Sequence, residues 1–246
     1  MKYKSVLMTH ADGGMHHLGI KAEDISENII LTPDPMMVEY YAKFMEGAVM
    51  KGDYREYVTY TGTYNNKPLT VMSCGFGCMP MAIAIEELNH IGGKNVIKID
   101  TNVSIQEDIC VGDIVIAKGA VRGEGASREY IDISFPAVAN MELLSKAIDV
   151  NPNTKIGMFR SHDVENLESP YAPNGMERIK KWTDLGVDVI DAETSSMYIV
   201  GSCLKVNVAS ISLIKENYIN NTKLDKSKLD ELRKELFDLA ANILTK

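Results

Sequence analysis

Apolar residues along the chain follow two alternating patterns. Short runs rich in β-branched residues predict buried strands over residues 29–32, 69–73, 95–99, 113–117, 155–159, 187–190 and 206–213. Stretches with apolar residues at helical spacing predict helices over 34–46, 79–91, 137–150, 174–185, 193–204 and 225–244. Strands that alternate with helices favour parallel pairing in a layered α/β fold. Because the strands are almost continuously apolar, we expect a sheet that is covered on both faces.

Several of these strands end in polar or glycine-rich sequence. The segment Ser73–Gly77 follows an apolar run and precedes a predicted helix, and its two glycines would let a ligand approach the backbone closely. The same segment would also serve as an ordinary tight connection between strand and helix. Polar residues follow two further strands at 98–102 and 210–215, and Asp191 and Glu193 follow another. Ligands of such sheets bind at the carboxyl ends of strands, so these segments predict one shared pocket.

Composition narrows the class of protein. The chain has 246 residues, 45% of them hydrophobic and 24% charged, without a Pro/Gly/Ser-rich linker, so we expect a single domain over 1–246. A net charge of -8 argues against a nucleic-acid surface, and no apolar run approaches the roughly 18 residues of a membrane helix.

Cysteine spacing bears on metals and on location. Cys74 and Cys78 have no second Cys/His pair at metal-site spacing, so a zinc site is not expected. Four cysteines that lie mostly far apart are typical of reduced thiols in a cytoplasmic protein.

Several sequence blocks stand in an order that is found in one family. They are His17–Ile20, Pro33–Pro35, Tyr54–Tyr57, Ser73–Gly77, Ile83–Leu88, Val111–Val115, Gly125–Ser127, Phe135–Ala139 and Asp191–Glu193. With these blocks the chain resembles the nucleoside phosphorylase superfamily and, within it, the uridine phosphorylase branch, over most of its length.

The resemblance implies a fold, a reaction and an assembly. The expected fold is a three-layer α/β/α arrangement around a central mixed, partly barrel-like sheet. The expected reaction is the reversible phosphorolysis of a nucleoside to free base and ribose 1-phosphate, with inorganic phosphate as co-substrate and no metal or organic cofactor. The expected assembly is a homo-oligomer, a dimer or a hexamer built from dimers, in which a neighbour completes each site.

The resemblance also assigns residues to the sugar. Glu193 matches the second acid of the family's Glu-Met-Glu segment, which holds the ribose hydroxyls, and a carboxylate there would stabilise an oxocarbenium-like transition state. Asp191 matches the first acid, and Ala192 replaces the methionine. His17 matches the histidine that reaches the ribose of a neighbouring subunit.

Phosphate and base residues follow in the same way. Arg55 matches the arginine that crosses a dimer interface to phosphate, Lys98 stands where a second phosphate arginine is usual, and Thr101 matches a threonine that touches both phosphate and ribose. We assign base recognition to a separate set of residues. These are Gly75, Phe76, Gly77 and Glu165.

The chain departs from the family pattern at the phosphate loop. Pro33 replaces a glycine whose amide meets phosphate, Met37 replaces an arginine, and Asp100 adds a carboxylate beside the expected anion. The residues with which the family recognises uracil are not all present in this chain, and neither are those with which it recognises purines. Two alternatives therefore remain open beside phosphorolysis: a nucleoside hydrolase, with Asp100 as general base for water, and a catalytically silent nucleoside-binding homologue.

Overall fold

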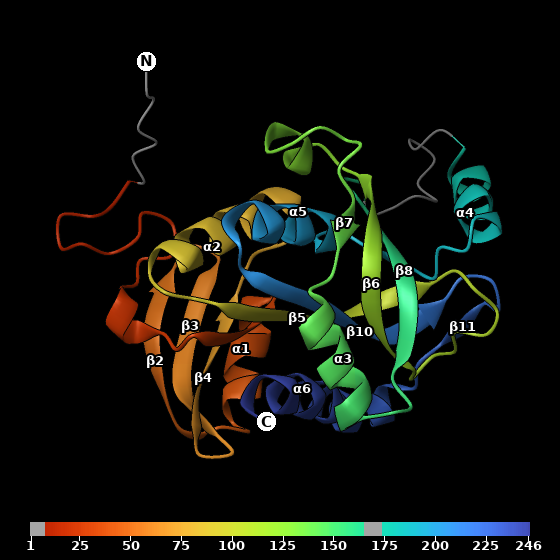
Figure 1. Cartoon of the computed structure of the whole chain (residues 1–246). Coiled ribbons are helices and arrows are strands. Elements are labelled where there is room, and N and C mark those ends of the chain that lie inside the picture. The colour runs from red at the N-terminus through yellow and green to blue at the C-terminus, as the bar shows by residue number, and fades with distance from the viewer. Residues whose placement is uncertain (1–7, 165–173) are drawn as a thin grey trace.

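The strands of the described chain join in one sheet that runs across the molecule (Figure 1). The structure, a computed structural model, describes residues 8–164 and 174–246. The strands are β1 (Asn28–Thr32), β2 (Glu46–Tyr54), β3 (Tyr57–Tyr64), β4 (Lys67–Ser73), β5 (Asn95–Ser104), β6 (Ile114–Gly123), β7 (Ala137–Val138), β8 (Lys155–His162), β9 (Val189–Asp191), β10 (Asn207–Asn217) and β11 (Thr222–Lys223).

Part of this sheet closes on itself. Strand β10 pairs in parallel with β5 and antiparallel with β6, and the path β6–β8–β9–β5 completes the ring, so five strands form a barrel. The remaining strands extend from β5 as an open arm in the order β1–β4–β3–β2. The expected mixed, partly barrel-like sheet is confirmed.

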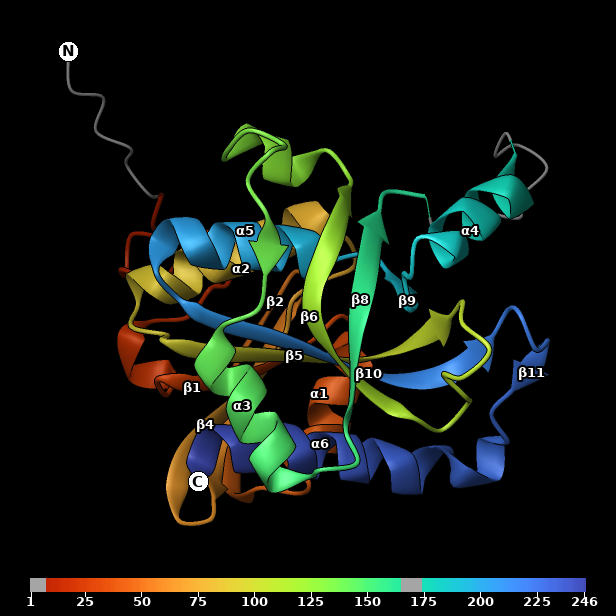
Figure 2. The same ribbon diagram turned by 45° about the vertical axis from the view of Figure 1, so that its right-hand side comes forward.

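Helices cover both faces of the sheet (Figures 1 and 2). They are α1 (Pro35–Ala42), α2 (Cys78–His90), α3 (Met141–Val150), α4 (Gly175–Asp184), α5 (Thr194–Leu204) and α6 (Leu229–Thr245). Neighbouring strand residues point to opposite faces: Ile29 packs in the core under α2 and α5, whereas Ile30 packs in the core under α1 and α6. This arrangement explains why the strands read as continuous apolar runs.

The sequence predictions located every long element except one hairpin. All seven predicted strands and all six predicted helices overlap observed ones. The hairpin β2–β3 was not predicted, because β2 is an edge strand that is mostly exposed and carries no apolar alternation. The short strands β7 and β11 were also not predicted.

Three predicted helix boundaries were wrong. The helix predicted from residue 225 begins at Leu229, after a short 3-10 turn over Lys226–Lys228. The helix predicted over 34–46 ends at Ala42, and Glu46 already begins β2. The helix predicted from residue 137 begins at Met141, because the Asn140 side chain accepts a hydrogen bond from the Leu143 amide and caps it, while Ala137 and Val138 pair with β6. In the described part of the chain, no helix is long and apolar enough to cross a membrane.

The strand ends that carry polar sequence meet at one edge. In the parallel pair β5–β10, Lys98 lies beside Ser210 and Asp100 beside Ser212. Strand β9 ends at Asp191, and α5 begins three residues later. Strand β9 pairs antiparallel with the last residues of β5, with Ile190 beside Val103. The second halves of β5 and β10 and the short strand β9 are therefore neighbours, as the predicted pocket requires.

Tyr198 fixes α5 to this barrel. Its buried hydroxyl donates to the Ala117 carbonyl at 2.7 Å and accepts from the Ser210 amide at 3.1 Å. We predict that Tyr198→Phe lowers the free energy of unfolding by about 1–3 kcal/mol, because both backbone groups lose their partner. Urea denaturation measures this loss. The control is Tyr54→Phe, at an exposed position on β2, which should stay within about 0.5 kcal/mol of the wild type. Equal stability of both variants would contradict the prediction.

Candidate active site

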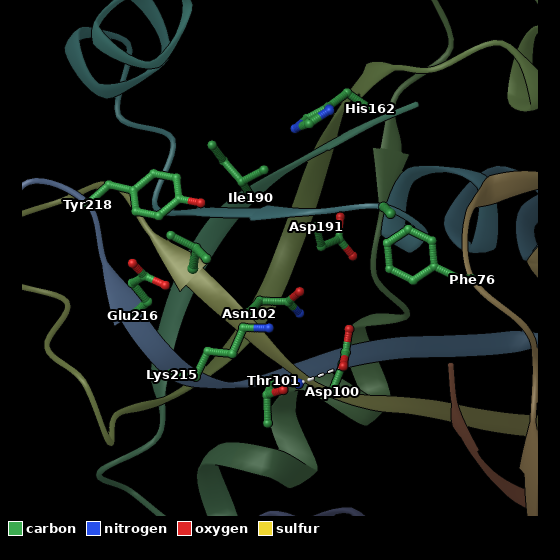
Figure 3. A pocket seen from close by; sticks show the side chains of 12 residues that line it. Phe76, Asp100, Thr101, Asn102, His162, Ile190, Asp191, Lys215, Glu216 and Tyr218 are labelled. Atoms are coloured by element: carbon green, nitrogen blue, oxygen red, sulfur yellow. Dashed lines mark hydrogen bonds between the residues drawn. The ribbon is translucent and has the colours of Figure 1, made fainter. Parts of the chain in front are cut away.

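A cavity of about 310 Å³ opens at the carboxyl edge of the barrel (Figure 3). Its walls come from β5, β9 and β10, from the turn before α2, and from the end of β8. The lining residues are Phe76, Asp100, Thr101, Asn102, Val103, His162, Ile190, Asp191, Ala192, Lys215, Glu216 and Tyr218. The predicted convergence of strand ends thus produces a pocket of a size that suits a small molecule.

A lysine lies under this cavity among carboxylates. The Lys98 ammonium donates to Asp191 Oδ2 at 2.8 Å and to Glu193 Oε2 at 2.5 Å, and Asp100 Oδ2 lies 3.7 Å away. The side chains of Lys98, Asp191 and Glu193 are fully buried. Lys98 was predicted to bind phosphate, but in this structure it does not reach the cavity wall and its charge is directed at the carboxylates.

Burial and charge act in opposite directions on this cluster. Burial would lower the pKa of Lys98, but Asp191, Glu193 and Asp100 outweigh it and hold that pKa well above its usual value. Burial raises the pKa of Glu193 to about 7, against the attraction of the Lys98 ammonium. Burial also raises the pKa of Asp100, whereas Lys98 and hydrogen bonds keep the pKa of Asp191 below its usual value despite burial. Asp191 is therefore the permanent anion of the cluster, and Glu193 titrates near neutrality.

Hydrogen bonds from three residues fix the Asp191 carboxylate. Ser161 donates to Oδ1 at 2.6 Å, and the Thr194 amide and hydroxyl donate to Oδ2 together with Lys98. The Thr194 contacts arise because α5 starts directly after β9, and its first amides point back at the strand. Asp191 lines the cavity but is only 5% exposed, so most of its hydrogen-bonding capacity is used inside the protein.

The glycine turn holds Glu193. The Gly77 amide donates to Glu193 Oε1 at 2.9 Å, and Gly77 adopts φ 98°, which favours glycine. Gly75 has φ 70°, and a side chain there would collide with Glu56 and Pro80. Of the three turn residues predicted to bind the base, only Phe76 lines the cavity. Glu165, the fourth, lies outside the described residues.

Thr101 lines the cavity as predicted, but its amide is already occupied. Asp100 Oδ1 accepts from this amide at 2.7 Å, and the Asp100 side chain is 21% exposed beside the cavity. An incoming anion therefore meets a carboxylate where the family pattern would supply a free amide. In Figure 3, Asp100 and Thr101 lie together at the floor of the cavity.

His17 and Arg55 do not line the cavity of their own chain. Glu87 accepts from the His17 and Leu18 amides and from His17 Nδ1, the last at 2.7 Å, so this segment is fixed on α2. Arg55 is exposed at the tip of the β2–β3 hairpin with φ 56°. Glu56 and Ser73 tie this tip to the turn before α2, because Ser73 Oγ donates to the Glu56 carbonyl at 2.7 Å.

Sequence reasoning assigned no role to Lys215, which lines the cavity from β10. The β10–β5 register shifts between Ile214 and Glu216, so Lys215 is the extra residue of a β-bulge. The sequence places Lys215 at a strand end but carries no sign of the bulge. The bulge explains why consecutive residues, Lys215 and Glu216, both reach the cavity.

His162 lines the opposite end of the cavity from β8 and is 5% exposed. Burial and the nearby charge of Arg160 lower its pKa to about 4, so its imidazole is neutral at pH 7. Neither ring nitrogen has a hydrogen-bond partner of good geometry. Within the described residues, no group of three or more His, Cys, Asp or Glu side chains is arranged to hold a metal ion.

Comparison with known proteins identifies the family. Residues 28–245 match the family model described as the phosphorylase superfamily. A uridine phosphorylase of Treponema pallidum is 33% identical over 210 residues, covering 81% of each chain. A DeoD-type purine nucleoside phosphorylase of Clostridium novyi is 28% identical, covering 92% of this chain and 98% of its own.

Solved structures agree with the sequence relatives. A uridine phosphorylase from Vibrio fischeri superposes with a TM-score of 0.86 at 27% identity, covering 96% of this chain and 99% of its own. The protein therefore belongs to the phosphorylase superfamily. Within it, the chain is an enzyme of the nucleoside phosphorylase type, a pentosyltransferase of the uridine phosphorylase-like branch.

The raised pKa of Glu193 predicts a pH effect on stability. The Glu193 carboxyl has a pKa of about 7 in the folded protein and near 4.5 in the unfolded chain, so it binds more protons when the protein is folded. The free energy of unfolding therefore falls as the pH rises from about 4.5 to about 7. We predict that Glu193→Gln removes this loss and flattens the dependence of the free energy of unfolding on pH between these two values. Urea denaturation at several pH values tests this, with the exposed Glu23→Gln as control. Identical slopes in wild type and Glu193→Gln would contradict it.

Proposed function

We propose that the protein catalyses the phosphorolysis of a nucleoside to free base and ribose 1-phosphate. The observation that carries this proposal is the cavity at the carboxyl edge of the barrel, directly beside the buried Lys98–Asp191–Glu193 cluster, in a chain of the phosphorylase superfamily. The reaction as proposed needs phosphate as co-substrate and no cofactor. The four cysteines are free, which supports a cytoplasmic setting.

In this proposal the ribose lies over Asp191 and Ala192, and Glu193 accepts hydrogen bonds from its hydroxyls. Glu193 follows Ala192 directly, and Ala192 lines the cavity. Because the Gly77 amide now occupies one Glu193 oxygen, the sugar reaches this carboxylate when the Phe76 turn moves aside. Negative charge below the sugar stabilises the positive charge that develops at the anomeric carbon.

The phosphate site is proposed to be completed by a second copy of the chain. Lys98 is engaged by carboxylates, so a cation must come from elsewhere to offset Asp100. Arg55 is exposed at the tip of a hairpin whose outer strand carries exposed Val49 and Met50. An edge strand that exposes Val49 and Met50 and leads to an arginine fits a dimer interface through which Arg55 reaches the partner's phosphate. His17 is proposed to reach the partner's ribose in the same way.

Hydrolysis is the second candidate, and Asp100 favours it. Asp100 is a partly exposed carboxylate at the cavity floor with a raised pKa, which suits a general base for water. A hydrolase would yield free ribose, whereas a phosphorylase yields ribose 1-phosphate. The sugar product therefore separates the two functions.

We predict that base release from a panel of uridine, cytidine, inosine and adenosine requires phosphate and yields ribose 1-phosphate. We further predict that Glu193→Ala lowers kcat/KM by about 10²–10³-fold, because it removes transition-state charge stabilisation. The exposed Glu23→Ala is the matched control and should retain activity. Equal release without phosphate, with free ribose as the product, would assign the enzyme to the hydrolases.

The shared site predicts complementation between two inactive variants. Arg55→Ala damages the partner's site and Glu193→Ala damages its own, so a mixed dimer contains one intact site. Chains mixed by joint refolding should regain activity in about a quarter of the sites. Activity assays of the mixture and of each variant alone measure this gain. If Arg55 acts within its own chain or has no role in the site, mixing will restore nothing beyond the average of the two variants.

A further inference from the structure

His162 is a buried side chain whose hydrogen-bonding groups are unused. It lines the cavity from the end of β8 and is only 5% exposed. Among the residues that the structure describes, neither Nδ1 nor Nε2 of this ring has a hydrogen-bond partner. Buried polar groups are normally paired, because an unpaired one makes the folded state less stable. An unpaired imidazole in the wall of a cavity is therefore suited to bind a ligand there.

The charged groups near this imidazole keep it neutral without selecting the nitrogen that carries the proton. Burial and the Arg160 guanidinium lower the pKa of His162, against the opposing effect of Asp191 and Asp163. Both carboxylates accept hydrogen bonds from other groups. Asp191 accepts those described above, and Asp163 Oδ2 accepts from the Gly125 amide at 3.1 Å. The imidazole therefore has no fixed tautomer.

A neutral imidazole without a fixed tautomer can donate to a ligand or accept from it. One ring nitrogen carries a proton and the other a lone pair, and the two exchange these roles when the tautomer changes. Arginine and lysine side chains, in contrast, can only donate. A histidine at this position can therefore bind either a carbonyl oxygen or an amino group of a ligand.

The position of His162 in the cavity assigns it to the base. In Figure 3 it lies at the end of the cavity away from Asp100 and Thr101, where phosphate is expected. In a displacement at the anomeric carbon, the attacking oxygen and the departing base lie on opposite sides of that carbon. A ribose over Asp191 therefore directs its base toward His162. The apolar side chain of Ile190 also lines the cavity and suits a base ring.

We propose that His162 determines specificity by a hydrogen bond to position 4 of a pyrimidine base, and that the enzyme binds uridine and cytidine alike. This inference rests on the proposed function and adds a substrate class to it. Position 4 lies across the ring from the glycosidic nitrogen, so it is the part of the base farthest from the sugar. With uracil, the protonated ring nitrogen of His162 donates to the carbonyl oxygen at position 4. With cytosine, the unprotonated nitrogen accepts from the amino group there.

The test measures the binding of three nucleosides at pH 7 without phosphate, by titration calorimetry. Uridine and cytidine carry an oxo and an amino group at position 4, whereas the riboside of pyrimidin-2-one carries only hydrogen there. We predict that the wild type binds uridine and cytidine with Kd values within about tenfold of each other, and the pyrimidin-2-one riboside about tenfold more weakly than either.

Variants of His162 separate hydrogen bonding from cavity shape. His162→Leu should weaken the binding of uridine and cytidine by about tenfold, and that of the pyrimidin-2-one riboside by less than about twofold. His162→Asn should bind uridine and cytidine more tightly than His162→Leu does, because its amide offers both a donor and an acceptor. The exposed His90→Leu on α2 is the matched control and should bind all three nucleosides as the wild type does.

Other results would overturn the inference and identify the reason. Kd values for uridine and cytidine that differ by more than about tenfold would show that the site recognises only one of the two groups. Equal losses for all three nucleosides in His162→Leu would show that this side chain only shapes the cavity. A wild type that binds uridine and cytidine but releases no base when phosphate is added would refute the proposed function and leave this inference standing. A wild type that binds none of the three would overturn both.

Discussion

The ion cluster around Lys98 is the constraint on which the rest of the site depends. One buried ammonium joins the middle of β5 to Asp191 at the end of β9 and to Glu193 just before α5. A buried charge without partners would be costly, so Lys98 and its carboxylates must be retained together. The cluster fixes Glu193 below the cavity and takes away the cation that family resemblance had assigned to phosphate.

This single arrangement changes the electrostatics of the pocket. Three carboxylates, Asp100, Asp191 and Glu193, surround the single Lys98 ammonium. The excess of negative charge is reduced near pH 7, because the raised pKa of Glu193 leaves this carboxyl partly protonated. In the proposed reaction, phosphate must therefore be met by a cation from another segment, and the exposed Arg55 hairpin of a second copy is the candidate.

Much of the fold could be predicted from the sequence, because both faces of the sheet are buried and buried strands leave long apolar runs. The β2–β3 hairpin was not predicted because its outer strand is mostly exposed and carries no apolar alternation. In the site, the pocket position and the lining by Asp191, Thr101 and Phe76 followed from strand ends and motif order. The burial of Lys98 and the direction of the Lys215 side chain did not, since the first depends on Asp191 and Glu193, which lie far along the chain, and the second on a register shift.

A double-mutant cycle between Lys98 and Glu193 tests the central claim most directly. The free energy of unfolding is measured for the wild type, Lys98→Met, Glu193→Gln and the double variant. We predict that Lys98→Met alone lowers the free energy of unfolding by about 3–5 kcal/mol and that the two changes are coupled by at least about 1 kcal/mol. Additivity within about 0.5 kcal/mol would show that the two side chains do not depend on each other, and the buried cluster could then not be what holds the site together.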